Sequence, residues 1–228
     1  MAERGTVAVL TKSSQDRTNT AWAQGGIAAV LSGTDSFEAH IEDTILAGDG
    51  LNRRDVVRIC VEEGPARIQE LMELGVTFDP SRDGSSEAHG LDLTREGGHS
   101  RRRVVHSKDM TGAAVQAALS RAVTSHPNIE VLEHHMAIDL ITRARLGLPG
   151  PDRCLGAYVL NTRATTIDTY LAKSVLLATG GAGKVYLYTS NPDVATGDGI
   201  SMAWRAGARV ANMEFFQFHP TCLYHPEA

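Results

Sequence analysis

Short apolar runs rich in β-branched residues recur along the chain and predict strands. The first, TVAVL at residues 6–10, is continuous, which is typical of a strand buried on both faces of a parallel sheet. The second half holds further runs of this kind, at residues 129–132, 136–142, 156–160, 166–171 and 174–179. Short polar turns separate the last three, so we expect a β-meander that feeds a final buried strand.

Between these runs, apolar residues recur at the spacing of amphipathic helices. The clearest helix spans residues 55–74. Gly75 supplies its natural end, although the Gly64-Pro65 pair should kink it or split it in two. Its inward-facing positions are expected to be Val56, Val57, Ile59, Cys60, Ile68, Leu71, Met72 and Leu74. Further helices are expected at residues 27–30, 36–47, 107–123 and 197–206, and a surface loop at residues 79–90.

The stretch from Asn19 to Gly26, NTAWAQGG, is the first candidate binding element. Gly25 and Gly26 tolerate positive φ and leave no Cβ to obstruct a flat ring or a phosphate. Thr20 and Gln24 supply polar groups for a ring edge. Taken alone, the octet is explained equally well by an ordinary turn without a ligand.

A second glycine cluster, at residues 180–183, follows the predicted strand 174–179. Two such clusters in one α/β pattern favour a ligand that lies across the crevice at the carboxyl edge of a sheet. Gly197-Asp198-Gly199 then opens a helix whose free N–H groups suit an anion or a polar ring edge. The plainer interpretation makes Asp198 a simple helix cap.

Composition narrows the function classes. The chain has 228 residues, 42% of them hydrophobic, and a formal net charge of -5, and its only run of three basic residues is Arg101-Arg102-Arg103, which argues against nucleic acid as the main partner. No apolar run reaches membrane-spanning length and residues 1–5 are no signal peptide, so we expect no membrane partner and a cytoplasmic location. No nucleophile elbow or Walker loop appears.

Metal binding is the weaker alternative. His219, Cys222 and His225 have a spacing that zinc tolerates, and His134-His135 adds a pair, but no Cys-x-x-Cys accompanies them, so we expect no metal. The cysteines are odd in number and far apart, which predicts reduced core thiols: Cys60, Cys154 and Cys222.

The motifs together resemble the L-aspartate oxidase family, which is related to the flavoprotein subunits of succinate dehydrogenase and fumarate reductase. The resemblance rests on AQGGIAA, TREGGHS, ATGG, TGDGI and EFFQFHPT, which begin at residues 23, 94, 178, 196 and 214. It spans nearly the whole chain, and the run 93–99 is the most discriminating part.

The resemblance implies an α/β fold, an FAD-binding Rossmann-like domain of the glutathione reductase type with an inserted β-meander. The dinucleotide fingerprint Gly-x-Gly-x-x-Gly is absent from the chain, and residues 6–10 look like the second strand of such a unit. We therefore expect a fragment truncated at both ends. Residues 1–212 would form a partial FAD-binding domain without its first βα unit, and residues 213–228 the beginning of a capping domain.

The implied activity is FAD-dependent oxidation of L-aspartate to iminoaspartate, with oxygen or fumarate as electron acceptor. In the family this is the first step of de novo NAD biosynthesis, and quinolinate synthase consumes the imine. The flavin would supply the redox step, so the protein need only orient it and tune its charge. The family's catalytic arginine would lie beyond Ala228, so the chain alone is expected to be inactive.

The resemblance also assigns roles by position. The FAD contacts would be Lys12, Asn19, Thr20, Ala21, Trp22, Ala23, Gln24, Gly25, Gly26, Gly180 and Asp198. Asn19 stands where succinate dehydrogenase relatives carry the histidine bonded to the flavin, which implies noncovalent FAD. His219 would bind the side-chain carboxylate of the substrate, and Glu96 its ammonium group, which succinate lacks.

Each of these assignments has a rival. Without the family, Glu96 is most simply a solvated loop acid beside Arg95 and Arg101. The chain as a whole could instead belong to a succinate dehydrogenase or fumarate reductase flavoprotein subunit, or be a noncatalytic remnant. Asn19 and Glu96 speak against the dehydrogenase.

Overall fold

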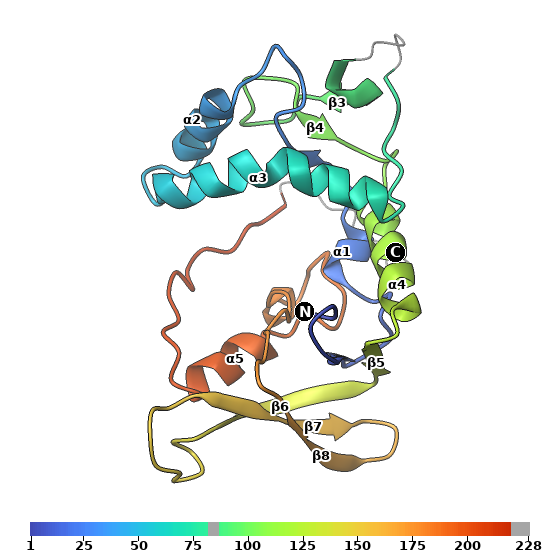
Figure 1. The fold of residues 1–228 in the computed structure, drawn as a ribbon. Coiled ribbons are helices and arrows are strands. Elements are labelled where there is room, and N and C mark those ends of the chain that lie inside the picture. The colour runs from blue at the N-terminus through green and yellow to red at the C-terminus, as the bar shows by residue number, and fades with distance from the viewer. Residues whose placement is uncertain (82–86, 220–228) are drawn as a thin grey trace. The chain divides into compact units, whose positions relative to one another are not determined.

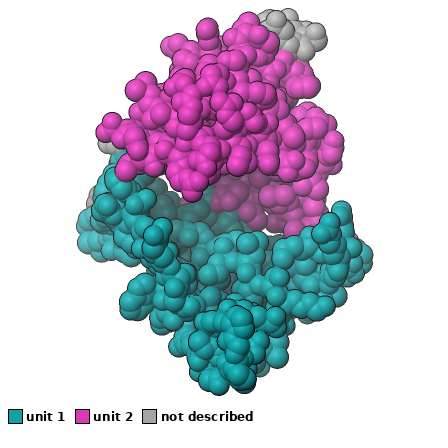
Figure 2. Space-filling model, turned by 60° about the vertical axis from the view of Figure 1, so that its left-hand side comes forward, with its two compact units in different colours: residues 1–19, 126–228 teal, residues 20–125 magenta. Residues whose placement is uncertain are grey.

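The computed structural model describes residues 1–81 and 87–219. The chain divides into two compact units (Figure 2). Unit 1 consists of Met1–Asn19 and His126–Ala228, and unit 2 of Thr20–Ser125. In the described part of the chain, no helix has both the length and the apolar character needed to cross a membrane.

Unit 1 begins with a parallel strand pair. β1 (Val7–Thr11) pairs with β5 (Ile129–Glu133), in register from Val7 opposite Ile129 to Thr11 opposite Glu133. Both strands were predicted, but the expected burial of the first on both faces is wrong, because Ala8 and Val9 are exposed. Val7, Leu10 and Thr11 are half-buried, and Leu10 packs on the apolar cluster of unit 1.

The predicted meander is confirmed in part. β6 (His135–Thr142), β7 (Cys154–Asn161) and β8 (Thr166–Leu171) form an antiparallel sheet in that order, so two of the three runs expected in the meander are present (Figure 1). α5 (Asp198–Arg205) packs on β6 and places Met202, which is 1% exposed, against Leu140 and Val159. Apolar burial on one face of the sheet thus fixes α5, and with it the start of that helix.

The final buried strand predicted at residues 174–179 is wrong. These residues have no regular structure and are exposed, with Leu176 76% exposed. A strand needs a hydrogen-bonded neighbour, and none of the described strands pairs with this run. A short 3-10 helix, η2 (Gly183–Val185), follows it.

Two packed helices form one part of unit 2. α2 (Phe37–Ala47) begins at Ser36, whose hydroxyl accepts the Ala39 N–H, and it packs on α3 (Arg54–Glu73). α3 runs unbroken through Pro65, so the predicted split is wrong. Proline removes one N–H from the helix ladder, and buried Val61 and Ile68 hold the helix on either side of it.

The inward face of α3 is only partly as expected. Ile68 is buried and Leu71 and Met72 pack on the core, whereas Ile59 is 58% exposed. Val56, Cys60 and Leu74 are exposed as well. The predicted end is confirmed, because Gly75 has φ +95 directly after the last turn.

A small antiparallel sheet forms the rest of unit 2 together with α4 (Thr111–Ser125), close to the helix predicted at residues 107–123. Its strands lie in the order β2 (Ile27–Ala28), β4 (Val104–Val105), β3 (Leu93–Thr94). The helix expected at residues 27–30 is therefore wrong: the short run pairs with β4, and this tertiary pairing overrides the helix propensity of its alanines. The loop prediction at 79–90 falls partly outside the described residues, and the short segment η1 (Glu87–Gly90) has left-handed backbone at Ala88 and His89, as a turn does.

Candidate functional site

In unit 1, a lysine–aspartate pair links the carboxyl end of β1 to the start of α5. Lys12 Nζ lies 2.9 Å from Asp198 Oδ2 and 2.6 Å from Thr196 Oγ1. The two charged side chains are about one-fifth exposed, at 20% and 19%. Gly197 occupies the helix cap, so the interpretation of Asp198 as a simple cap is wrong; its carboxylate pairs with Lys12 instead.

The glycines at the start of α5 leave no room for added side chains. A Cβ at Gly199 would lie 1.7 Å from Thr179 Oγ1, and one at Gly197, where φ is +74, would lie 2.9 Å from the Ala182 Cβ. Gly180 has φ +69, and a Cβ there would be 3.6 Å from Asn19 Nδ2. The sequence-predicted residues of unit 1 thus form two neighbouring pairs, Lys12 with Asp198 and Asn19 with Gly180.

The octet begins with α1 (Asn19–Trp22) and continues as an irregular segment whose backbone is held by α4. The Gly112 N–H donates to the Ala23 carbonyl at 3.0 Å, and a Cβ at Gly112 would lie 1.9 Å from the Thr20 carbonyl oxygen. Trp22 is 57% exposed. The octet is therefore fixed from one side while most of its residues face outward.

The two glycines of the octet differ in the space around them. A Cβ at Gly26 would lie 2.2 Å from the Val105 carbonyl oxygen, so β4 requires glycine there. A Cβ at Gly25 would meet nothing within 4 Å. Neither residue has positive φ, so the tolerance of glycine for that conformation is not used here. The fold therefore requires glycine at position 26 and places no such demand on position 25.

Glu96 lies in the hairpin between β3 and β4. The hairpin is closed by the Arg103 N–H, which donates to the Thr94 carbonyl at 3.1 Å, and by a turn in which the His99 N–H donates to the Glu96 carbonyl at 3.2 Å. The Glu96 side chain is exposed and forms no ion pair with any residue that the structure describes. Its carboxylate is accessible to a cationic ligand group.

A buried ionic cluster, which sequence reasoning missed, lies behind this hairpin. Arg103 is 0% exposed; its Nε and Nη2 each donate to Asp35 at 2.8 Å, and its Nη1 donates to Asp43 Oδ2 at 2.5 Å. Burial alone would raise the pKa of both carboxyl groups. For Asp35 the hydrogen bonds from Arg103 and the Ser36 N–H outweigh burial and lower the pKa. The signal that could have found it is the position of Arg103 directly before two buried valines.

Asp43 is the more strongly shifted acid. Burial would raise its pKa, but hydrogen bonds from the Ser100 N–H and hydroxyl, followed by Arg103, bring the pKa down to about 2. His40, 8% exposed, lies beside the cluster with its ring centroid 5.7 Å from that of His99. Burial, followed by the charges of Arg103 and His99, lowers the pKa of His40.

His219 is exposed and follows an aromatic cluster of unit 1, in which Tyr186 lies 4.7 Å from Phe216 and 5.1 Å from Phe218 between ring centroids. Glu96 belongs to unit 2, so the two predicted substrate residues lie in different units. Cys222 and His225 of the metal alternative fall outside the described residues. Within residues 1–81 and 87–219, no group of three side chains could hold a metal ion.

Comparison with known proteins agrees with these features. The FAD binding domain family matches residues 1–228. L-aspartate oxidase of Pseudomonas aeruginosa is 56% identical over 227 residues, and L-aspartate oxidase 1 of Ralstonia nicotianae is 55% identical over 228. These matches cover 97% and 100% of the chain but 41% and 42% of the relatives, so the chain spans about two-fifths of their length.

Solved structures show the same fold. An E. coli quinol fumarate reductase matches with a TM-score of 0.79 and 32% identity, covering 88% of this chain and 32% of that one. A Mycobacterium smegmatis Sdh1 structure matches with a TM-score of 0.79 and 30% identity, over 90% of this chain and 35% of that one. The fold class and the FAD cofactor expected from the motifs are confirmed, and the chain belongs to the FAD binding domain family.

Proposed function

We propose that this chain is part of an L-aspartate oxidase that oxidises L-aspartate to iminoaspartate, with oxygen or fumarate as electron acceptor. The observation that carries the proposal is the identity of 56% to a curated L-aspartate oxidase, against 32% and 30% to the fumarate reductase and Sdh1 structures. The exposed carboxylate of Glu96 supports it, because an ammonium group distinguishes aspartate from succinate.

The residues present fit FAD. Gly25 borders open space, Gly180 has φ +69, and Lys12 supplies a cation directly after β1. We assign the FAD contacts to Lys12, Gly180, Asp198 and the octet from Asn19 to Gly26. When bound, FAD would accept the hydride from C2 of the substrate.

The roles of the chain's own residues follow from their chemistry. Asn19 has no imidazole with which to bond the flavin, so the FAD is held noncovalently. Glu96 pairs with the substrate ammonium group and His219 with its side-chain carboxylate. We assign residues 213–228 to the beginning of a capping domain. An enzyme that consumes the unstable imine, as quinolinate synthase does, acts next, which places the reaction in NAD biosynthesis in the cytoplasm.

The test uses a chimaera in which residues 1–228 replace the matching segment of the Pseudomonas aeruginosa L-aspartate oxidase. We expect peroxide formation with L-aspartate and none with succinate, and yellow FAD released into the supernatant when the protein is precipitated with acid. Oxidation of succinate without oxidation of aspartate, or flavin that stays with the precipitate, would instead support a succinate dehydrogenase or fumarate reductase type of flavoprotein.

A further inference from the structure

We propose that Asp43 is a positioning residue: through Ser100 and Arg103 its carboxylate holds the hairpin of residues 95–102 in the conformation that presents Glu96 to the substrate ammonium group. This inference rests on the proposed function of Glu96. The evidence is a convergence of hydrogen bonds in unit 2 that neither the motifs nor the helix pattern indicated.

Three donors converge on one oxygen of Asp43. The Ser100 N–H and the Ser100 hydroxyl each lie 2.8 Å from Asp43 Oδ2, and Arg103 Nη1 lies 2.5 Å from the same atom. Ser100 follows Glu96 by four residues, and the turn that closes at His99 separates them. The carboxylate on α2 is thus bonded directly to the segment that leaves the Glu96 turn.

Arg103 gives this contact a rigid base. Its side chain is fully buried and donates two hydrogen bonds to Asp35. Its N–H donates to the Thr94 carbonyl, and its own carbonyl accepts the Ala29 N–H at 2.9 Å. Arg103 is therefore fixed through both its backbone and its side chain. It directly follows the hairpin of residues 95–102, so it anchors the carboxyl end of that hairpin.

The second acid is not needed to neutralise the arginine. Asp35 alone forms the bidentate pair that satisfies one guanidinium charge. Adding Asp43 leaves the cluster one negative charge in excess, which is costly at a site where Asp43 is 15% exposed. The hydrogen bonds from Ser100 offset that cost, so the excess charge is held in place by the hairpin itself.

The primary test measures hydrogen exchange of residues 94–102 in the 228-residue chain. Asp43→Asn should accelerate exchange of the Ser100 amide about tenfold, because a charge-assisted hydrogen bond is lost. Glu42→Gln is the matched control, since it makes the same chemical change on the preceding residue of α2, whose carboxylate pairs with Arg54. Unchanged exchange in Asp43→Asn would overturn the proposal.

A milder variant guards against misfolding. Ser100→Ala keeps the Asp43–Arg103 pair and removes only the hydroxyl bond, so it should leave the unfolding midpoint almost unchanged and still accelerate hairpin exchange severalfold. Exchange in Ser100→Ala identical to that of the unsubstituted chain would count against the proposal even if Asp43→Asn does not fold.

Kinetics in the chimaera connect the hairpin to Glu96. Asp43→Asn should raise the KM for L-aspartate about tenfold, leave the KM for fumarate within twofold, and leave FAD content unchanged, while Glu42→Gln changes none of these. An equal rise in the KM for L-aspartate and the KM for fumarate would contradict a positioning role. Glu96→Gln, run in parallel, separates the two claims. If Glu96→Gln changes neither KM, the proposed role of Glu96 is wrong. If Glu96→Gln raises the KM for L-aspartate alone while Asp43→Asn changes neither KM, only the positioning role of Asp43 is wrong.

Discussion

Lys12 and Asp198 form an ion pair of 2.9 Å that joins the end of β1 to the first turn of α5. The residue after Asp198, Gly199, packs closely on Thr179: a Cβ at Gly199 would lie 1.7 Å from Thr179 Oγ1. Because the Lys12 and Asp198 side chains are both mostly buried, each depends on the other for charge compensation.

Replacement of Lys12 by Met should therefore weaken FAD binding by the chimaera about tenfold and lower the free energy of unfolding by about 1–2 kcal/mol. The measurement is a flavin fluorescence titration together with urea unfolding. Lys184→Met is the matched control, because Lys184 pairs with Asp193, whose side chain is 84% exposed. Equal FAD affinity in both variants would remove Lys12 from the cofactor site.

Gly25 and Gly26 allow the demands of ligand and fold to be separated. Gly26→Ala should lower the free energy of unfolding by about 1–3 kcal/mol, because its Cβ would collide with the Val105 carbonyl. Gly25→Ala meets open space and should change stability by less than about 0.5 kcal/mol while weakening FAD binding. Urea unfolding and FAD titration of the two variants check this. Undiminished FAD binding by Gly25→Ala would mean that the octet does not approach the cofactor.

The buried cluster around Arg103 predicts a large loss of stability on mutation. Arg103→Met should lower the free energy of unfolding by about 3–5 kcal/mol, because it leaves the Asp35 and Asp43 carboxylates buried without a cation. Urea unfolding measures the loss. Arg53→Met, which breaks an exposed pair with Asp55, should change the free energy of unfolding by less than about 1 kcal/mol. Similar losses in both variants would show that the buried cluster contributes no more than a surface pair.

Stability should fall in acid in two steps. His40, facing Arg103, His99, Asp35 and Asp43, has a pKa below its ordinary value of 6.5, so the unfolded chain takes up that proton first and stability decreases as pH falls below 6.5. The pKa of Asp43 is about 2, below its ordinary 3.8, so its contribution is complete above 3.8 and is lost as pH falls toward 2.

Urea unfolding of the chain and of His40→Leu between pH 7.5 and 4.5 tests the first step. The variant should lose the part of the pH dependence that begins near 6.5. A variant whose stability follows pH as the unsubstituted chain does would contradict the assignment to His40.

Periodic elements were predictable because local pattern and tertiary packing agree in them. The local sequence marks the N-cap of the helix at residues 36–47 and the turns between the strands of the meander. The predictions for residues 27–30 and 174–179 were wrong because the structure of these runs depends on partners far away in the chain. The first run pairs with β4, while the second pairs with no described strand.

The site shows the same division. Lys12, Asn19, Gly180 and Asp198 were expected together, and the structure pairs Lys12 with Asp198 and places the Asn19 side chain near Gly180. The cluster of Arg103 with Asp35 and Asp43 was missed, because 68 and 60 residues separate the partners and a basic run beside a loop is ordinarily a solvated surface.

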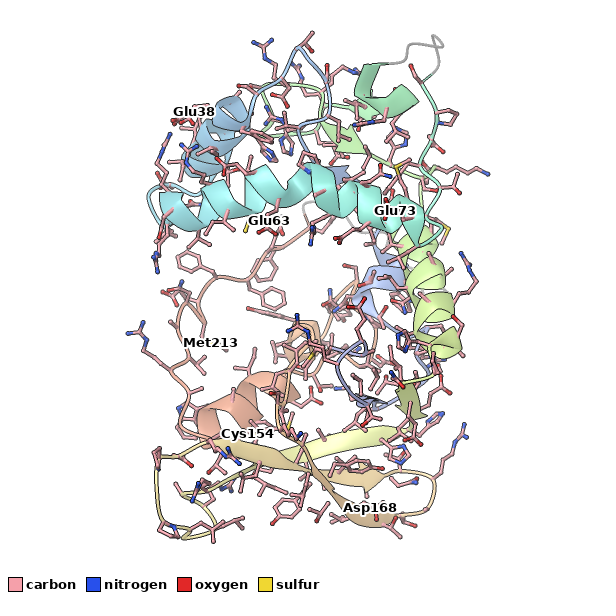
Figure 3. The ribbon with its side chains drawn as sticks, viewed as in Figure 1. Glu38, Glu63, Glu73, Cys154, Asp168 and Met213 are labelled. Atoms are coloured by element: carbon pink, nitrogen blue, oxygen red, sulfur yellow. The ribbon has the colours of Figure 1, made fainter. Side chains whose placement is uncertain are left out.

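The central claim is that Glu96 selects an amino acid substrate in an FAD-dependent oxidase. The most direct measurement compares kcat/KM for L-aspartate oxidation and for fumarate reduction in the chimaera and its Glu96→Gln variant. Glu63→Gln serves as control, since Glu63 is an exposed carboxylate on α3 (Figure 3). We predict a loss of about 100-fold for aspartate, less than threefold for fumarate, and no change in the control. Equal losses for both substrates, or none, would contradict the account.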